Sequence, residues 1–167
     1  AHTLENDQRN DIFKGVKKSS DSIFMYDHPF RKCTYRELEI AVSEGLTTFT
    51  KARRQFRRYK KSDFPVDFGL YEANIIIRKH DINSQKLMDF WWSEYMNSSK
   101  RDQTSLMFAS YQTGIRIHSL GQCNLREGGE HFHLDLSSRI RNMNSKTVNI
   151  LMRILNQAFI LFGGSLK

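Results

Sequence analysis

Apolar side chains recur at steps of three or four from residue 34 to residue 61, a spacing that places them on one side of an α-helix. Thr34 opens this stretch, and Glu37 three residues later matches a capping box, in which two side chains satisfy free amides of the first turn. Pro65 lies just beyond its end. We therefore predict one long amphipathic helix, whose apolar stripe contains Tyr35, Leu38, Val42, Leu46, Phe49, Ala52, Phe56 and Tyr59.

Short apolar runs predict the β-strands. Residues 22–27 form a run that stops at His28 and Pro29, and proline has no amide with which to continue a strand ladder. Residues 73–78 are rich in β-branched side chains, a composition typical of a central strand buried on both faces. Two further strands are predicted at 115–120 and 131–136.

Three further helices follow from capping residues and apolar spacing. Asn83 is the predicted N-cap of a helix that runs to about Asn97. Ser99 and Asp102 match the start of the next helix, and Gly114 suits a left-handed C-cap at its end. The last predicted helix is strongly apolar and spans 147–162.

The order of these elements predicts an α/β fold with a partly parallel sheet flanked by helices. Strands alternate with helices along most of the chain, which favours parallel pairing. The 167 residues are 39% apolar and 26% charged, which excludes collagen-like, coiled-coil and disordered classes. We divide the chain into a polar leader without apolar periodicity at 1–21, a main domain at 22–136 and a C-terminal helical segment at 137–167.

The net charge of +8 changes this picture only locally. Residues 51–61, KARRQFRRYKK, hold seven basic side chains and no acidic one, while the rest of the chain is nearly neutral. The basic side chains lie mostly off the apolar stripe, so a solvated face or one that meets an anionic membrane surface is favoured. Binding to nucleic acid is the less favoured interpretation of the same charge.

Several common classes find no support in the sequence. No apolar run approaches the ~20 residues of a membrane-spanning helix, and Cys33 and Cys123 suit neither a disulfide framework nor a zinc site. P-loop, dinucleotide-binding, HExxH and GxSxG motifs do not occur. We expect a piece of a longer protein, with a reduced, cytoplasmic or membrane-peripheral location favoured.

His28 and Arg31 follow the first predicted strand, where open α/β sheets place their ligand crevices. Their charge and hydrogen-bond donors suit a phosphate or a sugar hydroxyl. The simpler interpretation is that both satisfy the loop and the start of the next helix, and on spacing alone it is favoured.

Polar side chains also surround the strand at 73–78. Glu72 and Asn74 lie two residues apart and therefore share a face, while Asp102 and Gln103 begin a later helix. A carboxylate and an amide suit the hydroxyls of a ligand, although Asp102 also suits a helix cap. We add Arg78 and His80 to this candidate site, together with Trp91, because Trp91 and Trp92 cannot both face the core.

His131 and His133 alternate on one face of a predicted strand. Two imidazoles on one face suit a divalent metal, but two ligands do not complete a site. A surface or otherwise satisfied pair is the simpler interpretation.

Four motifs in order resemble a known family. HPFRKCTYRELE at 28–39, GLYEANIIIRKH at 69–80, FWWSEY at 90–95 and KRDQTSL at 100–106 resemble the glycosyltransferase-like domain of the plant TOD and MUCI proteins and of many bacterial and viral sugar-chain enzymes. A more distant similarity is to GT-A folds of the glycogenin and galactosyltransferase group.

The resemblance implies that the chain transfers a sugar from a nucleotide sugar to a glycan or lipid-linked acceptor. It implies that Asp102 and Glu72 are catalytic, that Asn74, Gln103, His28 and Arg31 line the cleft, and that His131 or His133 binds manganese or magnesium. The main domain would then be the acceptor-side part of a GT-A-like enzyme.

One departure from the GT-A pattern is that no Asp-x-Asp motif occurs in the chain. We therefore expect a nucleotide-binding half before residue 1, or a domain without turnover. The alternatives are hydrolysis of a lipid amide, attributed to part of the family, a basic module that binds nucleic acid or a membrane, and a structural domain whose helix at 147–162 docks on a missing half or a second copy.

Overall fold

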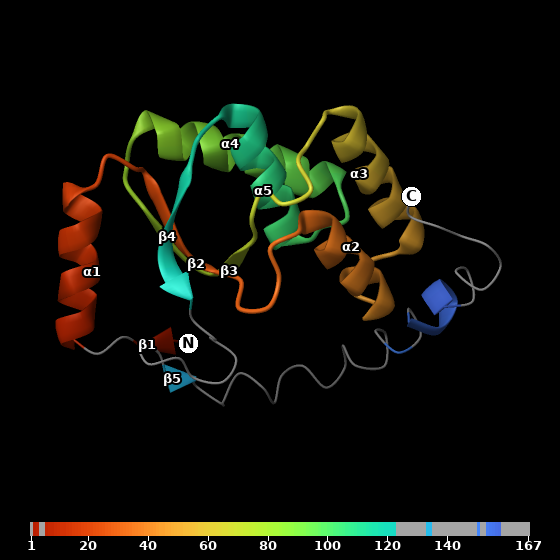
Figure 1. Cartoon of the computed structure of the whole chain (residues 1–167), viewed down its shortest axis with the longest axis horizontal. Coiled ribbons are helices and arrows are strands. Elements are labelled where there is room, and N and C mark those ends of the chain that lie inside the picture. Colours follow the sequence, from red (N-terminus) through yellow and green to blue (C-terminus); the bar gives the residue numbers. More distant parts are fainter. Residues whose placement is uncertain (1, 4–5, 123–132, 135–149, 151–152, 158–167) are drawn as a thin grey trace.

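A three-stranded mixed sheet forms the centre of the molecule (Figure 1). The computed structural model describes residues 2–3, 6–122, 133–134, 150 and 153–157. The central strand β2 (Ile23–Asp27) pairs in parallel with β4 (Ile117–Gln122) and antiparallel with β3 (Tyr71–Arg78). A separate antiparallel pair joins β1 (His2–Thr3) to β5 (His133–Leu134). The parallel pair and the flanking helices confirm the predicted α/β class.

In the described part of the chain, helices α1 to α5 lie around the sheet, and α4 and α5 pack against each other. The buried core lies between the sheet and α2, α3, α4 and α5, and includes Ile23, Met25, Leu38 and Leu106. In the described part of the chain, no helix combines the length and the apolar character needed to cross a bilayer. The bounds are α1 Asn6–Lys18, α2 Thr34–Ser43, α3 Phe49–Lys61, α4 Ile82–Asn97 and α5 Asp102–Thr113.

The prediction of one long helix over residues 34–61 is wrong, because the chain turns between α2 and α3. Gly45 adopts a φ of 71°, a left-handed conformation that glycine reaches without a steric penalty. Thr48 then caps α3 by accepting a hydrogen bond from the Lys51 amide at 3.3 Å. Val42 and Phe49 on either side of the turn are buried, whereas Leu46 within it is 37% exposed. Hydrophobic spacing alone therefore did not reveal the break.

Two predicted caps are also replaced. Asp81, not Asn83, caps α4, since its Oδ1 accepts a hydrogen bond from the Ser84 amide at 2.8 Å. This bond is the main cause that lowers the pKa of Asp81. The residue before α5 is Arg101 and provides no side-chain cap, so the Ser99 cap is wrong, whereas Gly114 has the predicted left-handed conformation, with a φ of 69°.

Residues 1–21, predicted as a polar leader, contain regular structure. Helix α1 occupies most of them and has only one buried side chain between residues 10 and 18, that of Val16. So polar a helix has no apolar stripe for the sequence pattern to reveal. Strand β3 also differs from its prediction, because it is an edge strand and its Asn74 and Arg78 side chains are exposed.

Asn156 attaches the described C-terminal residues 153–157 to the turn between α2 and α3. Its side-chain oxygen accepts a hydrogen bond from the Phe49 amide at 3.1 Å, and its amide donates to Val42 O at 2.8 Å and Thr47 O at 3.0 Å. The side chain is 4% exposed. Of the predicted helix at 147–162, residues 150 and 153–157 are helical and the others lie outside the described residues.

Replacing Asn156 by alanine is expected to lower the free energy of unfolding by about 2 kcal/mol, because three buried backbone groups lose their partner. Gln157→Ala, at the adjacent exposed position, is the matched control and should change it by less than about 0.5 kcal/mol. Urea unfolding of both variants measures the difference. Equal values would show that the Asn156 contacts do not stabilise the fold.

Candidate functional site

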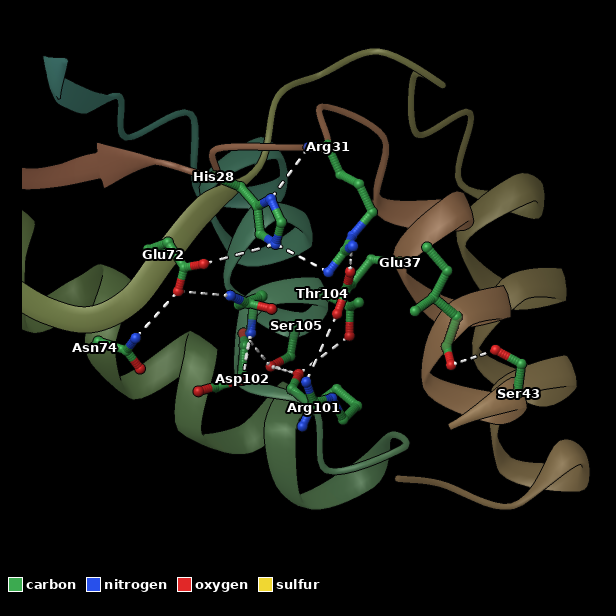
Figure 2. Close-up of polar contacts among 12 residues, drawn as sticks. His28, Arg31, Glu37, Ser43, Glu72, Asn74, Arg101, Asp102, Thr104 and Ser105 are labelled. Atoms are coloured by element: carbon green, nitrogen blue, oxygen red, sulfur yellow. Dashed lines mark hydrogen bonds and ion pairs between the residues drawn. The ribbon is translucent and has the colours of Figure 1, made fainter. Parts of the chain in front are cut away.

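His28 lies at the end of β2 and is buried, with 2% of its surface exposed. Its Nδ1 accepts hydrogen bonds from the backbone amides of Phe30 and Arg31, at 3.2 and 3.1 Å. Its Nε2 lies 3.0 Å from Nη2 of Arg31 and 3.7 Å from Oε1 of Glu72 (Figure 2). His28 therefore holds its own loop through two backbone hydrogen bonds and lies beside the carboxylate of Glu72.

Glu72 is the centre of a buried polar cluster between β3 and α5. Its Oε2 accepts hydrogen bonds from Asn74 Nδ2 at 3.2 Å and Gln103 Nε2 at 3.3 Å. The predicted shared face of Glu72 and Asn74 is thus observed, but Glu72 is 2% exposed whereas Asn74 faces solvent. Gln103 is also buried, and its Oε1 has no hydrogen-bond partner among the described residues. The cluster ties the start of α5 to the sheet.

A second carboxylate, Glu37, joins this region to α2. It is not part of a capping box, because the N-cap is Cys33 and makes no side-chain bond. Instead its Oε2 accepts a bond from Arg31 Nε at 2.5 Å, and its Oε1 lies 3.6 Å from Arg101 Nη2 (Figure 2). Two arginines from separate loops therefore share one buried acidic group.

An open hollow of about 620 Å³ lies on the outer side of this polar cluster. We call it the aromatic hollow, because three of its lining residues are aromatic. Trp92 is 65% exposed and stacks on Tyr95 with ring centroids 5.9 Å apart. The hollow is lined by Arg78, Met88, Asp89, Trp91, Trp92, Tyr95 and Asp102.

Trp91 and Asp102 are held in place where α4 meets α5. The indole Nε1 of Trp91 donates to Asp102 O at 3.2 Å and to Ser105 Oγ at 3.0 Å. The Asp102 carboxylate lies in the first turn of α5, where the helix dipole favours a negative charge, and its Oδ1 accepts a bond from the Gln103 amide at 2.9 Å. The ring and the carboxylate thus border the hollow with fixed orientations.

A second hollow of about 540 Å³ adjoins the first and shares Arg78, Met88 and Asp89 with it. We call it the adjoining hollow, and it contains His80, which is exposed. The two hollows lie beside α4 and share three lining residues, and we call the pair the groove.

The structure thus separates the candidate residues into two connected sets. Arg78, His80, Trp91 and Asp102 line the groove, whereas His28, Arg31, Glu72 and Gln103 lie behind it in the polar cluster. Asn74 bonds to the cluster from an exposed position. The link between the sets is the start of α5, where Asp102 and Gln103 are neighbours.

Sequence reasoning missed several residues of this region. The sequence pattern assigns Glu37 to a cap and gives Arg101 no role, although both lie inside the quoted motifs at 28–39 and 100–106. Trp92 and Tyr95 are spaced by three, and this spacing on an exposed helix face was the available signal for the aromatic wall.

The metal prediction falls largely outside the described structure. His131 is not among the described residues, and of His133 only the backbone pairing with Thr3 in β1 and β5 is described. Within the described ranges, histidine, cysteine and carboxylate side chains do not gather in groups of three or more. The described residues therefore offer no complete cage for the ion, and we derive no step through it.

Comparison with known proteins gives one match. Residues 8–130 match the family model described as TOD1/MUCI70, glycosyltransferase-like domain. No curated protein and no solved structure matches the chain.

Proposed function

The chain belongs to the TOD1/MUCI70 glycosyltransferase-like domain family, and from this premise we propose that it takes part in sugar transfer from a nucleotide-sugar donor to a glycan or lipid-linked acceptor. The observation that carries the proposal is the groove beside α4. In it an aromatic wall, an arginine and a carboxylate face the same open space.

Each part of the aromatic hollow suits a sugar. The rings of Trp92 and Tyr95 offer flat apolar surfaces to the C–H face of a pyranose, and their polar edges remain in solvent. Asp102 accepts hydrogen bonds from sugar hydroxyls, and Arg78 donates to hydroxyls or to a diphosphate. We therefore assign this hollow to the sugar and Arg78 to the boundary with the diphosphate group.

In the proposed reaction the acceptor oxygen bonds to the anomeric carbon while the bond from that carbon to the nucleoside diphosphate breaks. The acceptor hydroxyl loses its proton, and Asp102 is the carboxylate we assign to receive it. Negative charge develops on the departing diphosphate, and Arg78 lies where a cation would stabilise it. Positioning of the acceptor and stabilisation of the developing charge supply most of the rate acceleration.

Glu72 takes a different role in this proposal from Asp102. Because Glu72 is 2% exposed and faces His28, Asn74 and Gln103, we assign it as a positioning residue. It would act by holding the first turn of α5, and with it the Asp102 carboxylate. Asp102 lines the hollow itself and keeps the catalytic assignment.

The test of the proposal is release of nucleoside diphosphate from a panel of nucleotide sugars, with mixed oligosaccharides as acceptors. We expect release that requires an acceptor and that falls when Arg78→Gln removes the cation of the groove. Arg116→Gln is the control, because Arg116 is also exposed and lies just before the start of β4. Unchanged release by the Arg78 variant would show that the groove takes no part in the reaction.

A separate prediction concerns the metal implied by the family resemblance. Manganese added together with a nucleoside diphosphate is expected to raise the melting temperature of the protein, because a ligand of the folded state stabilises it. Replacing both His131 and His133 by alanine should remove the rise, while His2→Ala should retain it. A rise of the same size in the double variant would exclude these histidines as ligands.

A further inference from the structure

At the opposite part of the molecule from α1, residues 153–157 contact the start of α3 (Figure 1). Arg54, Arg57 and Lys61 follow one another at steps of three and four, so they share one face of α3, and all three are exposed. Acidic residues are absent from the whole of α3. The face is therefore strongly positive along its length.

Within the described residues, only part of the positive charge at 51–61 has a partner. Arg58 binds the buried carboxylate of Glu94 through two hydrogen bonds, at 2.5 and 2.6 Å. The ammonium of Lys60 lies 4.6 Å from the ring centroid of Tyr35. For Arg53, Arg54 and Arg57, no carboxylate of the described residues lies within ion-pair distance.

These three arginines surround a hollow of about 380 Å³ at the start of α3. Its other described lining residues are Phe49 and Thr50. The Nε atom of Arg53 is buried and has no hydrogen-bond partner in the described part of the chain. A donor that is withdrawn from water in an arginine-lined hollow suits the oxygens of a phosphate group.

Exposed apolar side chains lie on residues 150 and 153–157, which contact the start of α3 through Asn156. Residues 153–157 present their polar Asn156 to the protein interior, while Ile154 and Leu155 are 60% and 56% exposed. Ile150, one turn before Ile154, is 56% exposed as well. Phe49 connects the two features, because its amide bonds to Asn156 and its side chain lines the arginine hollow.

We propose that this basic-apolar face, formed by Arg54, Arg57, Lys61, Ile150, Ile154 and Leu155, binds an anionic lipid surface. Arginines that attract phosphate headgroups beside aliphatic side chains that enter the acyl boundary are the two contributions that hold a protein on such a surface. A soluble anion would use the arginines but not the aliphatic side chains. The proposal does not depend on the proposed sugar transfer.

Sedimentation of the full chain with vesicles tests it. We expect binding to vesicles that contain phosphatidylserine, little binding to phosphatidylcholine alone, and loss of binding as salt is raised. The double variant Arg54→Gln, Arg57→Gln should bind about 30-fold more weakly, since each basic residue near the surface contributes about one kcal/mol. Lys17→Gln, Lys18→Gln, on the exposed side of α1, removes the same charge and should bind as the wild type.

The apolar part of the face has its own variant. Ile154→Ser, Leu155→Ser should weaken vesicle binding and leave the oligomeric state unchanged. Equal binding by the arginine variant and its α1 control, or no binding to anionic vesicles, would overturn the proposal. So would a dimer that the serine variant abolishes, because the apolar side chains would then belong to a contact between two copies.

Discussion

Replacing Glu37 by alanine is expected to lower the free energy of unfolding by about 3 to 5 kcal/mol. The side chain of Glu37 is 2% exposed and serves both Arg31 and Arg101, whose side chains are 20% and 23% exposed. Its removal leaves two cations in a largely buried region without their common partner. Guanidinium unfolding of the purified variant measures the loss.

The control for this prediction lies two residues along the same helix. Glu39→Ala breaks a surface pair with Arg36, whose side chain is 66% exposed, and should change stability by less than about 1 kcal/mol. Both substitutions replace glutamate by alanine within α2, so the change in helix propensity is the same in both and cancels when the two losses are compared. Losses of equal size would mean that the Glu37 pairs stabilise no more than a surface ion pair.

The second large effect is on sugar transfer. Asp102→Asn is expected to lower the rate of transfer by at least about 100-fold, because the amide no longer accepts a proton from the acceptor. The asparagine oxygen still accepts the bond from the Gln103 amide, so the start of α5 is retained. The melting temperature should therefore change by no more than about 2 °C.

Asp67→Asn is the control for Asp102, because Asp67 is exposed in the loop before β3 and also loses one negative charge. It should transfer sugar at the wild-type rate. If Asp102→Asn lowers stability and activity together, Asp102 acts on the fold of α5. If it lowers neither, the assignment of this carboxylate is wrong.

The sequence motifs contain the candidate residues that line the groove. Arg78 ends β3, His80 lies in the loop after it, Trp91 is on α4 and Asp102 begins α5, yet all four line one groove. Alternation along β3 and the start of α5 were local signals, and the family resemblance joined them. Local pattern and family motif together thus located the groove.

Burial could not be predicted in the same way. His28 and Glu72 have the same polar character as Asp102, and only the packing of α5 against β3 decides that they are inside and Asp102 is not. The role of Glu37 was hidden for a similar reason. A glutamate three residues after a threonine fits a capping box, and its partner Arg101 is too distant in the chain for any local pattern to reveal.

The break between α2 and α3 shows a further limit of pattern reasoning. Leu46 keeps the apolar spacing of the sequence through the turn at Gly45, although its side chain is exposed in the folded chain. The basic segment at 51–61 shows the same limit. Arg58 was counted with the solvated charges, but a buried carboxylate on α4, Glu94, lies within reach only in the folded chain, and its hydrogen bond raises the pKa of Arg58.

The most direct test of the central claim uses the two tryptophans of the chain, Trp91 and Trp92, both of which line the aromatic hollow. Their fluorescence therefore reports whether a sugar enters it. Titration with a panel of nucleotide sugars and oligosaccharides should give a saturable change that Trp92→Ala weakens and Phe90→Ala, at a neighbouring exposed position outside the lining, does not. A panel of sugars that is transferred without any change in this fluorescence would contradict the account.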